Sequence, residues 1–202
     1  MSFLLPFVPL GVAAMYAERA LLPPLLVRLE NSLTHSLMHS LVHALSGARA
    51  FGLVLLVNVV ASGFLLVGLG MKVGRARALL RDKAAKDGEA DAEARYSLPN
   101  MYVSGDTLNA KKFNCVQRGH QQALETYPQF LALSLCGGYC FPLLTAAMGL
   151  LWMYARSKWA EGYASGDPAS RYDHWSSKGI WLALLLMSMT TVGTALTIME
   201  LI

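Results

Sequence analysis

Charged side chains are scarce in this sequence: Asp, Glu, Lys and Arg together make up 15% of its 202 residues. A soluble domain usually contains about a quarter of such residues. Hydrophobic residues reach 54%, and they gather in runs close to the ~20 residues that a helix needs to cross a bilayer. Because little of this apolar content is left for a soluble core, the sequence predicts an integral membrane protein.

Dense basic blocks and paired cysteines are also missing. The net charge of +4 is spread along the chain, which argues against a nucleic-acid partner and fits an anionic substrate or a membrane surface. Three cysteines are present, Cys115, Cys136 and Cys140, without a CxxC pair or the spacing of a metal site. They are therefore predicted to be small buried side chains in a reduced compartment, and no metal site is expected.

Four apolar segments predict an all-α fold, an integral membrane four-helix bundle. They cover approximately residues 51–71, 113–139, 143–163 and 179–202. The second segment has a polar first half and contains Pro128, which membrane helices tolerate by local kinking. A charged stretch at 80–94 is either a solvated, partly helical segment or a flexible one. The basic residues of the two longer loops predict that these loops face the cytosol, or the matrix of a mitochondrion.

Residues 1–50 precede the predicted bundle of residues 51–202 and form an apolar extension. Residues 25–46 fit a helix with leucines on one broad face and His35, His39 and His43 on the other. Histidines four residues apart can share a metal, but no acidic or cysteine ligand joins them. The extension is expected to be helical and amphipathic, and to lie on the membrane surface or against a partner.

A polar ridge is predicted on the second segment. Arg118, Gln122, Glu125 and Gln129 fall within about 60° of one another on a helix of 100° per residue. Ionisable side chains inside a membrane are expensive, so they indicate a functional site by default. Two interpretations stay open: a salt-bridged ridge that joins helices, or a site for a zwitterionic, peptide-like ligand.

The third segment carries a complementary stripe. Trp152, Arg156, Trp159 and Tyr163 share one helical face. These side chains could form an aromatic belt at the membrane interface, or they could complete the ligand site of the second segment.

Two stretches, FNCVQRGHQQALETYPQF and ARSKWAEGYASGDPASR, resemble the MAPEG family (membrane-associated proteins in eicosanoid and glutathione metabolism). The resemblance covers about residues 51–202, and within the family it is strongest to the type-three microsomal glutathione S-transferases. It implies a homotrimer that binds glutathione between protomers, with Arg77 contributed by a neighbouring protomer and Arg171 approaching the thiol as the catalytic residue. With the stripe included, the expected glutathione site consists of Arg77, Arg118, Gln122, Glu125, Arg156, Trp159 and Tyr163.

The resemblance predicts a glutathione S-transferase or glutathione-dependent peroxidase that acts on lipophilic electrophiles or lipid hydroperoxides in the endoplasmic reticulum or mitochondrial membrane. Two residues depart from the family pattern: Trp159 stands where Tyr is usual, and Thr126 stands where leukotriene-C synthase has Tyr, although type-three members also lack that Tyr. The apolar extension, the charged insert at about 80–94 and the Trp159 departure support an alternative, a structural accessory subunit that packs against foreign membrane subunits with reduced or no activity. Membrane lipids are expected partners in both cases.

Overall fold

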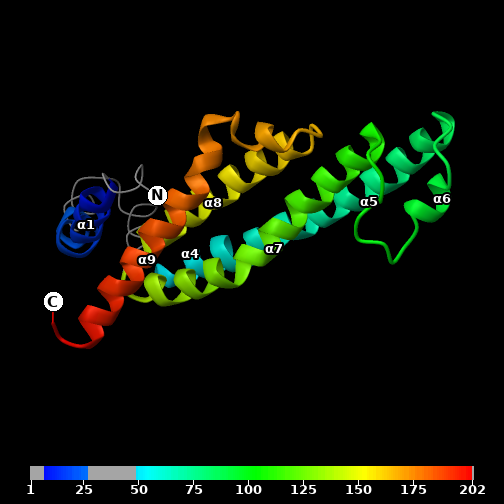
Figure 1. The fold of residues 1–202 in the computed structure, drawn as a ribbon. Helices are drawn as coiled ribbons and strands as arrows, with labels where there is room; N and C mark the ends of the chain where they lie inside the picture. The colour runs from blue at the N-terminus through cyan, green and yellow to red at the C-terminus, as the bar shows by residue number, and fades with distance from the viewer. Residues whose placement is uncertain (1–6, 27–48, 202) are drawn as a thin grey trace, which may run out of the picture. The chain divides into compact units, whose positions relative to one another are not determined.

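A computed structural model of the chain describes residues 7–26 and 49–201. All regular secondary structure in these ranges is helical (Figure 1), which confirms the all-α fold class. The elements are α1 (Val8–Tyr16), η2 (Ala17–Leu21), α4 (Phe51–Val54), η4 (Leu55–Ala61), α5 (Ser62–Lys86), α6 (Ala92–Arg95), α7 (Leu108–Cys140), α8 (Pro142–Tyr163), η5 (Pro168–Tyr172), η6 (Trp175–Lys178) and α9 (Gly179–Ile198).

Two of the described helical segments are long and apolar enough to cross a membrane, Phe51–Lys86 and Trp175–Ile198. Helices α7 and α8 are also long, with 33 and 22 residues, but their polar ridge and stripe lower their apolar content. These two segments agree with the predicted membrane protein of helical architecture, and the crossing of α7 and α8 stays a prediction.

Helix boundaries differ from the predicted segments at two places. The first helix does not end near Lys72 but continues to Lys86, because the basic segment that follows the apolar run is rich in good helix formers. Helix α7 begins at Leu108 rather than near residue 113. Thr107 caps it, since its Oγ1 accepts a hydrogen bond from the backbone N–H of Ala110 at 3.2 Å. Pro128 lies inside α7 without interrupting it.

The residues group into two compact units. The first unit contains residues 1–62, 128–152 and 179–202, and the second contains residues 63–127 and 153–178. The first unit contains residues on both sides of the predicted domain boundary at residue 50. The expected role of the extension, on the membrane surface or against a partner, stays a prediction. Every residue of the predicted glutathione site belongs to the second unit.

A buried asparagine joins three helices of the first unit. Asn58 is completely buried in η4, a short π-helical stretch of the kind often found at functional or strained positions. Its Nδ2 donates to Ser134 Oγ at 2.9 Å and to the carbonyl of Thr145 at 3.1 Å. A Cβ at Gly149 would overlap the Asn58 carboxamide, so this contact requires glycine on α8.

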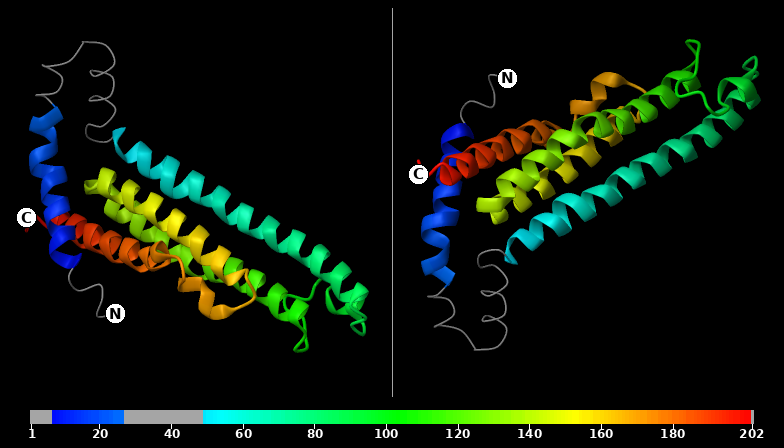
Figure 2. Two further views of the ribbon diagram at one scale, coloured as in Figure 1. Left: turned by 90° about the horizontal axis from the view of Figure 1, so that it is seen from above. Right: turned by 90° about the horizontal axis from the view of Figure 1, so that it is seen from below.

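The described part of the extension packs on the last helix within the first unit. Helix α1 crosses α9 (Figure 2), and Gly11 makes the close approach possible. A Cβ at Gly11 would lie 2.7 Å from Leu186 and 2.8 Å from Met189. Most of the helix predicted over residues 25–46, including His35, His39 and His43, lies outside the described residues.

The charged stretch at 80–94 is partly helical, as one of the two interpretations predicted. Helix α5 covers its first part and α6 its last residues, with a turn at Gly88 where φ is +77°. The stretch folds over a hydrophobic cluster of the second unit. The members of this cluster are Val73, Leu80, Ala84, Ala92, Tyr96, Val103, Ala110 and Phe113.

Glu89 organises the polar side of this turn. Its carboxylate accepts hydrogen bonds from Arg95 at 3.1 Å, Thr107 at 2.8 Å and Asn109 at 2.8 Å, and only 10% of the side chain is exposed. Desolvation alone would raise the pKa of Glu89, but the three donors outweigh it and lower the pKa below its usual value. A single carboxylate therefore ties the turn after α5 to the start of α7.

Candidate functional site

The ridge on α7 contains an ion pair. Arg118 Nη1 lies 2.6 Å from Glu125 Oε1, and both side chains are partly exposed, at 39% and 44%. The two residues are seven apart, so two helical turns place them on one face. The cation and the anion of this face therefore form an ion pair within α7.

Arg156 connects α8 to the ridge. The residue is completely buried. Its Nη1 donates to the side-chain oxygen of Gln122, and its Nη2 donates to Thr126 Oγ1 at 2.9 Å. Its Cζ also lies 5.4 Å from the centroid of the Trp159 ring, within reach of a cation–π interaction. Arg156 therefore links Gln122 and Thr126 of α7 and Trp159 of α8 in one network.

The stripe continues to the loop that follows α8. The rings of Trp159 and Tyr163 lie 5.0 Å apart. Arg171, in η5, places its Cζ 5.8 Å from the Tyr163 ring and 5.0 Å from the Tyr172 ring, and its Nη1 donates to the carbonyl of Pro168. Arg171 thus lies beside Tyr163.

Gly162 makes this arrangement possible. A Cβ at this position would overlap the carbonyl oxygen of Ser170 and lie 3.0 Å from the Cα of Arg171. Because these atoms belong to the backbone, they could not move aside without displacing η5. The glycine before Tyr163 is therefore what lets the Arg171 segment approach α8.

A cavity of about 490 Å³ lies next to this network. Its volume is in the range typical of small-molecule sites. Arg118 and Tyr163 are the predicted site residues that line it. The full lining consists of Tyr102, Lys111, Asn114, Cys115, Arg118, Tyr163, Gly166 and Pro168.

Arg77 is the predicted site residue that does not join this group within the chain. Its Nη1 donates to the carbonyl of Tyr96 at 3.1 Å, and its Cζ lies 4.6 Å from the Phe113 ring. These contacts hold its guanidinium against the loop between α6 and α7. Of the remaining predicted residues, Gln122, Arg156 and Trp159 form the network and Glu125 pairs with Arg118, but none of these four lines the cavity.

Six lining residues were not predicted as site residues: Tyr102, Lys111, Asn114, Cys115, Gly166 and Pro168. Lys111, Asn114 and Cys115 precede Arg118 by seven, four and three positions, so extending the helical wheel by two turns would have placed them on the same face. Cys115 is buried, as predicted, but the same prediction is wrong for Cys136, which is exposed, and for Cys140, which is only partly buried. Tyr102 lies in a loop, and its hydroxyl donates to the side-chain oxygen of Gln121. Helical periodicity cannot predict a contact made by a loop residue.

The family comparison covers this whole region. The model of the MAPEG family matches residues 54–193, which is more than half of the chain. The match includes the α7 ridge, the α8 stripe and the Arg171 loop, whereas α1 precedes it. Family match, helical membrane architecture and connected polar faces agree, and the chain belongs to the MAPEG family.

Proposed function

We propose that this chain is a membrane glutathione S-transferase or glutathione-dependent peroxidase that acts on lipophilic electrophiles or lipid hydroperoxides. The observation that carries the proposal is the cavity lined by Lys111, Arg118 and Tyr163, with Arg171 Cζ 5.8 Å from the ring of that tyrosine. Cations and an aromatic phenol in one pocket suit an anionic thiol peptide.

The residues present fit glutathione by charge. Glutathione carries two carboxylates and one ammonium group, and the cavity offers the ammonium of Lys111 and the guanidinium of Arg118 for the carboxylates. Glu125, which pairs with Arg118 at 2.6 Å and does not line the cavity of the single chain, is assigned the ammonium group in the proposed site between protomers. Gln122 and Arg156 hold the ridge behind these groups.

Arg171 is assigned the activation of the thiol. Glutathione supplies a thiol whose pKa is near 8.5 when free, so only a few per cent is thiolate at neutral pH. A guanidinium held against the sulfur favours the charged form. Lowering the pKa by two units needs about 2.7 kcal/mol of differential stabilisation, which a charged hydrogen bond can supply.

The proposed assembly is a homotrimer with sites between protomers. Arg77 would then reach the site of a neighbouring copy, while its contacts with the Tyr96 carbonyl and the Phe113 ring fix its position in its own chain. The lipophilic substrate would enter from the bilayer of the endoplasmic reticulum or the mitochondrion.

The test is the substitution Arg171→Ala in purified, detergent-solubilised protein. We expect glutathione binding to change little, the ultraviolet absorbance of bound thiolate to disappear, and conjugation of 1-chloro-2,4-dinitrobenzene to fall about 100-fold, the factor that corresponds to two pKa units. Reduction of cumene hydroperoxide should fall in parallel. Lys178→Ala, which removes an exposed cation near α9, is the control. Unchanged thiolate absorbance in Arg171→Ala would contradict the assigned role.

A second candidate is a structural subunit of a larger membrane complex. The observation that favours it is α1 with the turns after it, which lie outside the family match and expose large apolar side chains. These side chains are Leu10, Val12, Tyr16, Leu21 and Leu25. The stoichiometry of the native particle decides: one copy beside foreign chains supports this candidate, and a self-trimer that binds three glutathione molecules excludes it as the main role.

A further inference from the structure

Arg19, in η2, lies between two cavities of the first unit. One cavity, of about 320 Å³, is lined by Val12, Met15, Tyr16, Arg19, Phe141 and Gly193. The other, of about 260 Å³, is lined by Glu18, Arg19, Leu22, Pro23, Leu26, Ala50, Tyr139, Cys140, Pro142 and Leu143. Arg19 belongs to both linings, so one cation borders two mainly apolar cavities.

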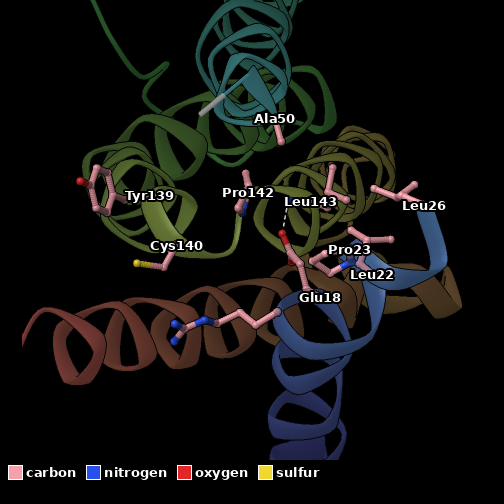
Figure 3. A pocket seen from close by; sticks show the side chains of 10 residues that line it. Glu18, Leu22, Pro23, Leu26, Ala50, Tyr139, Cys140, Pro142 and Leu143 are labelled. Carbon is pink, nitrogen blue, oxygen red and sulfur yellow. Dashed lines mark hydrogen bonds between the residues drawn. The ribbon is translucent and has the colours of Figure 1, made fainter. Parts of the chain in front are cut away.

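The carboxylate next to this cation is already engaged. Glu18 accepts hydrogen bonds from the backbone N–H groups of Leu143 at 2.7 Å and Leu144 at 2.8 Å, at the start of α8. Figure 3 shows Glu18 directed toward Leu143, with Tyr139 and Cys140 at one side of the cavity and Leu22 and Leu26 at the other. Glu18 therefore caps a helix rather than neutralising its neighbour.

The contacts of Arg19 itself are with neutral groups. Its Nη1 donates to Thr197 Oγ1 at 2.8 Å, and its Cζ lies 5.9 Å from the Phe141 ring. No carboxylate among the described residues forms an ion pair with it. A guanidinium has five N–H donors in a fixed fork, so several donors are available to an anion with two oxygens, such as a phosphate.

The surface around Arg19 is apolar and open. Val12 is 53% exposed, Tyr16 66% and Ile198 66%. In a membrane protein such a surface faces lipid or another chain, and a cation placed there attracts an anion. A soluble anion would be bound by the charge of Arg19 but would leave the two apolar cavities unfilled. A phospholipid matches both the charge and the cavities, because it has an anionic phosphate and two acyl chains.

We propose that Arg19 binds the phosphate of an anionic phospholipid whose two acyl chains occupy the two cavities. The site is built by α1, η2, the turn between α7 and α8, and α9, and it does not depend on glutathione chemistry. It gives the described part of the extension a ligand: the lipid would fill the space between the extension and the ends of α7, α8 and α9.

The test is lipid retention by the full chain in detergent, measured by native mass spectrometry during titration with dioleoyl phosphatidylglycerol. We expect one tightly held lipid per chain, weaker retention of dioleoyl phosphatidylcholine, and about tenfold weaker binding of phosphatidylglycerol to Arg19→Gln, as expected for loss of a charged hydrogen bond. Lys86→Gln removes the same charge from an exposed position at the end of α5 and should bind like the unaltered protein.

A second variant tests the cavities rather than the charge. Val12→Trp narrows the larger cavity and leaves Arg19 in place, so it should weaken binding of the dioleoyl lipid but not of dihexanoyl phosphatidylglycerol, whose chains are short. Both variants are first checked for unchanged thermal unfolding. Equal binding to Arg19→Gln and Lys86→Gln, or no effect of Val12→Trp on the dioleoyl lipid, would overturn the proposal in favour of non-specific surface attraction or of a protein partner on this face.

Discussion

Arg156 is a charged side chain completely removed from solvent, an arrangement that costs several kcal/mol unless the charge is well satisfied. Gln122 and Thr126 accept its hydrogen bonds, and the Trp159 ring lies against it. Thr126 and Trp159 both contact Arg156: the threonine offers an acceptor and the indole offers a π face.

We predict that Thr126→Val destabilises the protein. Valine has nearly the same shape as threonine but removes the oxygen that accepts from Arg156 Nη2 at 2.9 Å, so the free energy of unfolding should fall by about 1–3 kcal/mol. Thermal unfolding in detergent measures the change, and Thr126→Ser, which keeps the hydroxyl, should recover most of it. Equal melting temperatures for the valine variant and the unaltered protein would show that this contact contributes nothing.

At the scale of elements, the turn between α5 and α6 depends on Glu89. Its carboxylate joins residues of α6, of the α7 cap and of α7 itself, through Arg95, Thr107 and Asn109. The turn leads into the loop that carries Tyr102, which lines the cavity. The acidic and basic residues of this stretch therefore act on the site indirectly, by fixing the loop that borders it.

The lowered pKa of Glu89 predicts a pH dependence. A carboxylate whose pKa is lower in the folded than in the unfolded state stabilises the fold above its unfolded pKa, about 4.3, and this contribution is lost as the pH falls through the folded pKa. We expect pepsin to cleave residues 87–107 faster as the pH falls below about 4, and Glu89→Gln to be cleaved readily throughout. Glu93→Gln is the control, because the Glu93 side chain is 84% exposed. A pH profile of Glu89→Gln identical to that of the unaltered protein would contradict this role.

Helical periodicity was sufficient to predict the two polar faces. Arg118, Gln122 and Glu125 share a face because of their spacing, and so do Arg156, Trp159 and Tyr163. The same spacing could not show that Arg156 contacts Thr126, since which helix faces which depends on packing between distant segments. Nor could it predict the loop between α6 and α7, where contacts such as that of Tyr102 with Gln121 follow no repeat.

At the scale of the whole molecule, membrane topology depends on α7 and α8. Segments Phe51–Lys86 and Trp175–Ile198 are apolar enough to cross by themselves. If α7 and α8 also cross, the turn at Phe141 lies on the opposite side of the membrane from the turn after α5. If they do not, both turns lie on the same side.

We predict that the two turns lie on opposite sides. Single cysteines introduced as Asp91→Cys and Tyr139→Cys, in a chain whose three native cysteines are replaced by alanine, should react with a membrane-impermeant maleimide from opposite faces of sealed vesicles. Tyr139 lies next to this turn at the end of α7, and 71% of it is exposed in the single chain. Reaction of both positions from the same face would mean that α7 and α8 form a hairpin that does not cross.

The contacts of η2 with the rest of the first unit also constrain how the chain is made. Glu18 meets Leu143 and Leu144, and Arg19 meets Thr197, although 125, 126 and 178 positions separate the partners. During synthesis, which proceeds at about 5–20 residues per second, the η2 segment emerges long before either partner exists. Its apolar face and its two charges must be accommodated by lipid or by a chaperone until α8 and then α9 arrive. The hydrogen bonds of Glu18 and Arg19 therefore form late, after α8 and α9 have been synthesised.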